Sequence, residues 1–133
     1  MRFYLPDAQE HGFIRQGAIG AQEHYENFLR SKLERRRYGE FFSGPNEPPV
    51  ETYEDRMWLV EYYLRLCELA HRDGFKVAGI MDGVGRIGND AELASEGLNW
   101  LERIPYIVED LAPIYNNIDY AASHNYACRV GND

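Results

Sequence analysis

The clearest periodic pattern of the chain lies between residues 51 and 74. Apolar side chains recur there every three or four residues, which predicts one buried face of a helix. The main stripe consists of Met57, Val60, Leu64 and Cys67, and it is widened by Leu59, Tyr63, Leu66 and Ala70. Thr52, followed by acidic residues, fits the N-cap of this helix, and Asp73 with Gly74 fits its end. We therefore predict a central amphipathic helix over about residues 52–73.

Weaker helical patterns flank this segment. Residues 21–38 follow helical spacing, whereas residues 7–20 contain three glycines and are interpreted as a loop. Glycines and prolines break any helix in residues 39–50. A further helix is predicted over residues 90–103, and a last one begins near residue 106 because Pro105 interrupts the pattern.

These elements predict a mainly α fold. We expect residues 1–133 to form a single-domain helical bundle of about four helices, with at most a short strand pair. The alternative is an α/β fold with a small sheet, whose strands would lie near residues 2–5, 75–81 and 105–109. The pattern over residues 75–89 does not decide between strand, helix and loop, because helical spacing there coincides with several glycines.

Composition narrows the range of functions. A chain with 44% hydrophobic residues can bury a core, which excludes global disorder. It carries 14 Lys and Arg residues against 22 Asp and Glu residues, a net charge of -8, which disfavours direct binding of nucleic acid. No apolar run approaches the ~18 residues that cross a bilayer, so we expect no membrane contact and a cytoplasmic location.

The charge is unevenly distributed along the chain. Residues 1–38 have a net charge of +2, and residues 39–133 have a net charge of -10. An acidic body with exposed tyrosines suits docking on a basic partner protein, as an inhibitor, an antagonist or an immunity-type protein does. The predicted contact residues are Glu40, Glu47, Glu51, Tyr53, Glu54 and Asp55. The sequence does not specify an oligomeric state.

Two cysteines and two histidines suggest an alternative function. Cys67 and His71 are four residues apart on the central helix, and His124 and Cys128 have the same spacing in reverse order. On packed helices such pairs could supply the two sulfur and two nitrogen ligands of a tetrahedral zinc site. The chain would then be a metal-binding helical domain or a metal-dependent enzyme, with zinc as its only candidate cofactor. The simpler interpretation is that both cysteines are core residues.

A second alternative comes from a glycine-rich segment. Residues 83–88 match the GxGxxG pattern of dinucleotide-binding loops, so this segment, from Gly83 to Gly88, could bind a nucleotide. Asp82 and Asp90 oppose that hypothesis, because a carboxylate on either side of the loop repels a pyrophosphate. No nucleophile and base can be paired into a catalytic set, and the sequence therefore favours a non-enzymatic role while leaving enzyme activity open.

Overall fold

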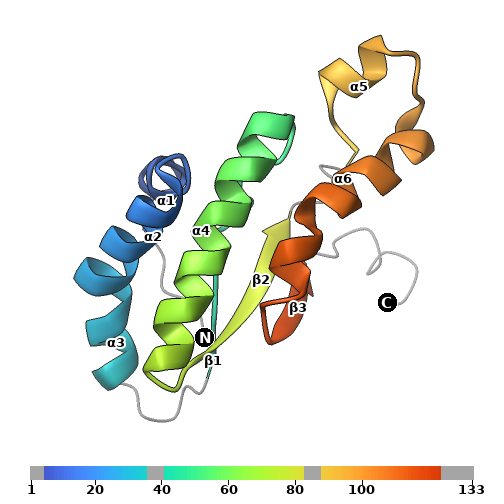
Figure 1. Ribbon diagram of the computed structural model, residues 1–133. Helices are drawn as coiled ribbons and strands as arrows, with labels where there is room; N and C mark the ends of the chain where they lie inside the picture. Colours follow the sequence, from blue (N-terminus) through green and yellow to red (C-terminus); the bar gives the residue numbers. More distant parts are fainter. Residues whose placement is uncertain (1–4, 36–40, 83–87, 124–133) are drawn as a thin grey trace, which may run out of the picture.

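Helices make up most of the chain, and a small parallel sheet lies beside them (Figure 1). The computed structural model describes residues 5–35, 41–82 and 88–123. Its helices are α1 (Asp7–Ile14), α2 (Gly17–His24), the π-helix η1 (Tyr25–Leu29), α3 (Arg30–Arg35), α4 (Tyr53–Arg72), α5 (Ala91–Ser95) and α6 (Trp100–Tyr115). Its strands are β1 (Phe41–Ser43), β2 (Lys76–Asp82) and β3 (Tyr120–Ser123). The mainly α prediction is confirmed, and the sheet has three strands in the described residues where at most a strand pair was expected.

The sheet has the order β1-β2-β3, and all its strands are parallel. Phe42 pairs with Val77, and Ala78 pairs with Tyr120. α4 therefore connects β1 to β2, and α6 connects β2 to β3. Because such crossovers are right-handed and both move in the same direction, they place both helices on one face of the sheet. α4 and α6 pack against each other there, and both begin at the end of the molecule where the strands finish (Figure 1).

The predicted central helix is confirmed as α4. Thr52 Oγ1 accepts a hydrogen bond of 3.0 Å from the backbone N–H of Asp55, and Gly74 follows the helix with a φ of +85°. Of the predicted stripe, Val60 and Cys67 are buried, while Leu64 is exposed. The residues predicted to widen the stripe, Leu59, Tyr63, Leu66 and Ala70, are all buried, and Tyr62 is buried with them. The periodicity thus located the helix and most of its inward face correctly, with Leu64 as the exception.

Tyr63 fixes the distance between α4 and the sheet. Its ring is fully buried and lies against Gly44, just after β1, and against Gly79 of β2. A Cβ atom on either glycine would overlap the Tyr63 ring. The two glycines therefore allow the backbones of β1 and β2 to approach a large aromatic side chain, which packs the helix tightly on the strands.

Three predictions about helices are wrong. The helix predicted over residues 90–103 is interrupted between α5 and α6. Residues 7–20 form α1 and the first part of α2, because Phe13 and Ile14 join the core and Gly20 packs closely on the Phe13 carbonyl. α6 runs through Pro105, so the strand predicted near residues 105–109 does not exist. The Pro105 ring is exposed, and the buried Ile107 and its neighbours offset the roughly 3 kcal/mol that a proline costs inside a helix.

The strands of the alternative fold have mixed outcomes. The strand predicted at residues 75–81 is confirmed as β2. Residues 2–4 lie outside the described part of the chain, so the first predicted strand is not described. In the described ranges, none of the helices combines the length and the apolar character that crossing a bilayer requires.

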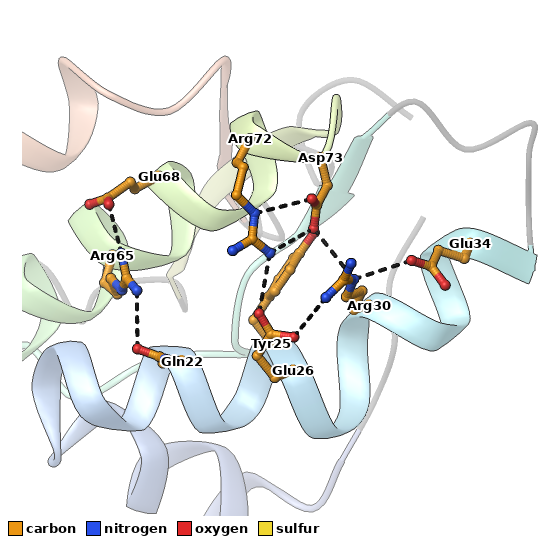
Figure 2. A network of polar contacts seen from close by, with 9 residues as sticks. All are labelled: Gln22, Tyr25, Glu26, Arg30, Glu34, Arg65, Glu68, Arg72 and Asp73. Atoms are coloured by element: carbon orange, nitrogen blue, oxygen red, sulfur yellow. Dashed lines mark hydrogen bonds and ion pairs between the residues drawn. The ribbon is translucent and has the colours of Figure 1, made fainter.

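A polar network fastens the N-terminal helices to the end of α4 (Figure 2). The hydroxyl of Tyr25 donates a hydrogen bond of 2.8 Å to Asp73 Oδ2. Arg72 donates to both carboxylate oxygens of Asp73 and also to Glu26, while Arg30 lies 3.6 Å from Asp73 Oδ2. Both arginine side chains are nearly half exposed, so each ion pair contributes little, and the buried Tyr25 ring adds the apolar contact.

His24 lies inside the helical layer. Its side chain is 1% exposed, and its ring stacks on Phe13 with 4.7 Å between the ring centroids. His24 Nδ1 and the Tyr62 hydroxyl share a hydrogen bond of 2.6 Å. Burial, with a smaller contribution from the charge of Lys32, lowers the pKa of His24 from 6.5 to about 4. The folded protein therefore holds a neutral imidazole at neutral pH.

The lowered pKa of His24 predicts that the protein becomes less stable as the pH is lowered. Unfolded His24 takes up a proton near pH 6.5 and folded His24 only near pH 4, so the unfolded chain binds more protons between these values. We expect the free energy of unfolding in urea to decrease by about 3 kcal/mol from about pH 7.5 to pH 4, at 1.36 kcal/mol per pKa unit. His24→Phe should remove that decrease. Equal pH slopes for both proteins would contradict it, and NMR titration of the ring checks the pKa directly.

Candidate functional site

The structure brings part of the predicted acidic face together at the start of α4. Tyr53 is 57% exposed, and Glu54 beside it is exposed as well. Asp55 is half-buried and lies 3.8 Å from Arg15 Nε, and Glu51 Oε2 accepts a hydrogen bond from the backbone N–H of Val50. Glu47 is half-buried with a φ of 40°, and Glu40 lies outside the described residues. Tyr53 and Glu54 are thus the most accessible members in the described part of this face.

A hollow of about 230 Å³ opens beside Tyr53. It lies where the start of α4 meets α5 and the first half of α6, at the end of the molecule where the strands finish (Figure 1). Its lining consists of Tyr53, Arg56, Asp90, Glu92, Leu93, Tyr106 and Asp110. Tyr106 and Asp110 are four residues apart on α6 and so share one side of that helix. This end of a parallel sheet is where α/β folds commonly bind ligands.

The wall of the hollow contains a buried ion network centred on Arg56. The Arg56 side chain is 2% exposed, although it lies in the first turn of α4. Its Nη1 donates to Asp90 Oδ2 at 2.8 Å and to the Val50 carbonyl at 3.0 Å, and its Nε donates to Asp110 Oδ2 at 2.8 Å. One guanidinium is thus shared by two carboxylates, which leaves the network with a net charge of -1.

Asp90 has a second role at the beginning of α5. Its Oδ1 accepts a hydrogen bond of 2.9 Å from the backbone N–H of Leu93, which makes Asp90 the N-cap. Burial raises the pKa of Asp90, but the backbone hydrogen bond from Leu93 and the Arg56 guanidinium outweigh this and hold it below its usual value. Asp90 is therefore a carboxylate in the folded protein at neutral pH.

The Asp90 cap lies just after the glycine-rich segment that was predicted to bind a nucleotide. The expected order of strand, glycine-rich segment and helix is present, since β2 precedes the segment and α5 follows it. Residues 83–87 lie outside the described residues, and Gly88 has a φ of +100° beneath the Trp100 ring. The start of α5, where a pyrophosphate would dock, already holds the Asp90 carboxylate. Nucleotide binding through this segment stays a prediction.

The charge and the rings of the lining favour a cation. Asp90, Glu92 and Asp110 outweigh the single Arg56, so the lining side chains carry a net charge of -2. Tyr53 and Tyr106, both more than half exposed, supply aromatic faces that attract a cation electrostatically. A guanidinium or an ammonium group entering the hollow would meet both features at once.

The predicted metal ligands are placed only in part. Cys67 is buried, and this burial, with the charge of Asp119, raises the pKa of its thiol to about 12, so the thiol is protonated at neutral pH when no metal is bound. His71 Nε2 donates a hydrogen bond of 2.7 Å to Asp119 Oδ2. His124 and Cys128 lie outside the described residues. In the described ranges no group of three or more His, Cys, Asp or Glu side chains is arranged to hold a metal.

Sequence reasoning missed the residues that complete the hollow. Arg56 lies one helical turn before the buried Leu59 and Val60 of α4. A charged residue on the inward face of a helix indicates a buried ion pair, and this was the available signal. Asp90 could be predicted as a cap, but its contact with Arg56 could not. Tyr106 and Asp110 follow Pro105, which wrongly suggested a helix start.

Comparisons with known proteins do not assign a function to this hollow. No protein-family model, no curated protein and no solved structure matches the chain. The function of the protein is therefore inferred from the chemistry and geometry of its own residues.

The buried ion network predicts a large difference between two arginines of α4. Arg56→Met leaves the buried Asp90 and the partly buried Asp110 without their cation and should lower the free energy of unfolding by about 3–5 kcal/mol. Arg65→Met on the same helix removes a more exposed pair with Glu68 and should cost at most about 1 kcal/mol. Urea denaturation at neutral pH measures both. Similar losses for the two variants would contradict the role of Arg56, and adding Asp90→Asn and Asp110→Asn should recover part of the loss.

Proposed function

We propose that this protein binds a partner protein with a basic surface and acts on it as an inhibitor or antagonist. The docking face consists of Tyr53, Glu54, Glu92, Tyr106 and Asp110, with Glu47, Glu51 and Asp55 at its margin. The observation that carries the proposal is the hollow between the starts of α4 and α5 and the first half of α6, which joins two exposed tyrosines to an acidic lining.

The hollow supports an anchored mode of binding. Binding energy at protein interfaces is concentrated in a few residues that fill pockets, and arginine is common among them. An arginine or lysine of the partner would enter the hollow, approach Glu92 and Asp110, and pack on the tyrosine rings. Because Arg56 already holds the carboxylates of Asp90 and Asp110 in place, the lining needs little rearrangement to receive the cation.

The charge distribution supports the same partner chemistry. Residues 39–133, which contain the whole docking face, have a net charge of -10. Such a field accelerates the encounter with a basic surface and weakens it as salt screens the charges. Tyrosine adds a large contact area at a small cost in conformational entropy, and it is enriched at interfaces.

The test compares two doubly substituted proteins with the same charge change. Glu54→Arg with Glu92→Arg reverses two exposed acids of the docking face, while Glu23→Arg with Glu109→Arg reverses two exposed acids elsewhere. Each protein is immobilised and exposed to an extract of its native host, and the retained proteins are identified by mass spectrometry. The wild type and the control should retain the same basic protein, and the docking-face variant should retain at least about tenfold less.

Salt and folding controls sharpen this test. The retained protein should leave the wild type as NaCl is raised from about 0.05 to 0.5 M, because screening weakens contacts between opposite charges. Far-ultraviolet circular dichroism checks that all three proteins are folded. Equal loss of the partner in both variants would show a general charge effect, and equal retention would show that the docking face is wrong.

A further inference from the structure

α6 carries an exposed apolar stripe on a side that does not line the hollow. The stripe consists of Leu101, Ile104, Val108, Ala112 and Tyr115, and we call it the α6 stripe. Leu101 is 71% exposed, and Val108 and Tyr115 are each 42% exposed. The core-facing residues of α6 are Ile107, Leu111 and Ile114. At 100° per residue, the stripe is centred about a quarter-turn from that core face, while Tyr106 and Asp110 lie on the other flank.

The spacing of the α6 stripe is symmetric about Val108. Leu101 and Tyr115 are each seven residues from Val108, and Ile104 and Ala112 are each four residues from it. Two identical helices can pair in antiparallel orientation about a two-fold axis at Val108. Leu101 of one copy then faces Tyr115 of the other. Ile104 then faces the small Ala112, so a larger aliphatic group meets a smaller one.

We propose that the α6 stripe pairs with the α6 stripe of a second copy of this chain. The occupant is a second copy because the spacing is self-complementary and because the stripe contains no charged residue to select a partner of opposite charge. In a chain with a net charge of -8, an uncharged strip lets two copies make contact without opposing carboxylates inside the contact. The hollow stays accessible in this arrangement, since it lies on the other flank of α6.

The size and the flanks of the stripe set the strength of the dimer. From Leu101 to Tyr115 the helix spans about 21 Å at 1.5 Å per residue, so this contact is smaller than the roughly 800 Å² per partner of a standard interface. The acidic Glu102 and Glu109 lie along one edge, and the antiparallel pair places the two copies of Glu109 on the same side of the contact. We therefore expect a weak dimer, with a Kd of tens to hundreds of micromolar, that salt strengthens by screening this repulsion.

Analytical ultracentrifugation of the full chain tests the proposal. Between about 5 µM and 1 mM the average mass should rise from monomer to dimer, and raising NaCl from about 0.05 to 0.5 M should lower the Kd at least about threefold. Val108→Glu places two carboxylates at the two-fold axis and should raise the Kd at least about tenfold. The matched control is Ile19→Glu, because Ile19 is 75% exposed on α2, and it should leave the Kd unchanged.

A cross-linking experiment keeps the proposal falsifiable if Val108→Glu disturbs folding. Because the axis passes at residue 108, Val108→Cys should form a disulfide-linked dimer on mild oxidation, and Ile19→Cys should not. A monomer through about 1 mM, an unchanged Kd for a folded Val108→Glu protein, or equal cross-linking of the two cysteine variants would each overturn the proposal. So would a monomer that captures a different protein through this stripe.

Discussion

The ion network around the buried guanidinium of Arg56 is the interaction on which the end of the molecule with the hollow depends. It joins α4 to Asp90, which is 34 residues away, and to Asp110, which is 54 residues away. A buried charge is costly unless opposite charges and hydrogen-bond acceptors surround it. Arg56 can therefore be buried at the start of α4 only when Asp90 and Asp110 lie beside it. The same contact positions the cap of α5 and the first half of α6, and it thereby forms the hollow.

α6 illustrates how one helix can serve several surfaces. Ile107, Leu111 and Ile114 pack towards the core, Tyr106 and Asp110 line the hollow, and the α6 stripe occupies a third side. Such a division requires a helix that continues through Pro105, since a break there would separate Leu101 and Ile104 from the rest of the stripe. The Asn99–Glu102 capping box fixes where the helix begins and thus which residue lies on each side.

Local signals predicted α4, and long-range contacts explain what they missed. The N-cap Thr52, the acidic first turn, the terminating Gly74 and the apolar spacing all predicted the same helix. At Pro105 the local rule and the packing of Ile107 disagree, and packing prevails. Tyr53 and Glu54 could be predicted because they are near neighbours at one helix start. The contribution of α6 to the site could not, since it depends on how β2 and β3 pair.

The use of arginine at position 56 follows from the geometry of its partners. The chain has only two lysines, Lys32 and Lys76, among its 14 basic residues. Arg56 reaches two carboxylates and a backbone carbonyl through two nitrogen atoms of one rigid, planar group. A lysine ammonium is a single point with a stronger hydration shell, so at this position it would be harder to desolvate and could not match the directions of all three acceptors. The surplus negative charge of the network therefore remains fixed at the hollow, where an incoming cation can meet it.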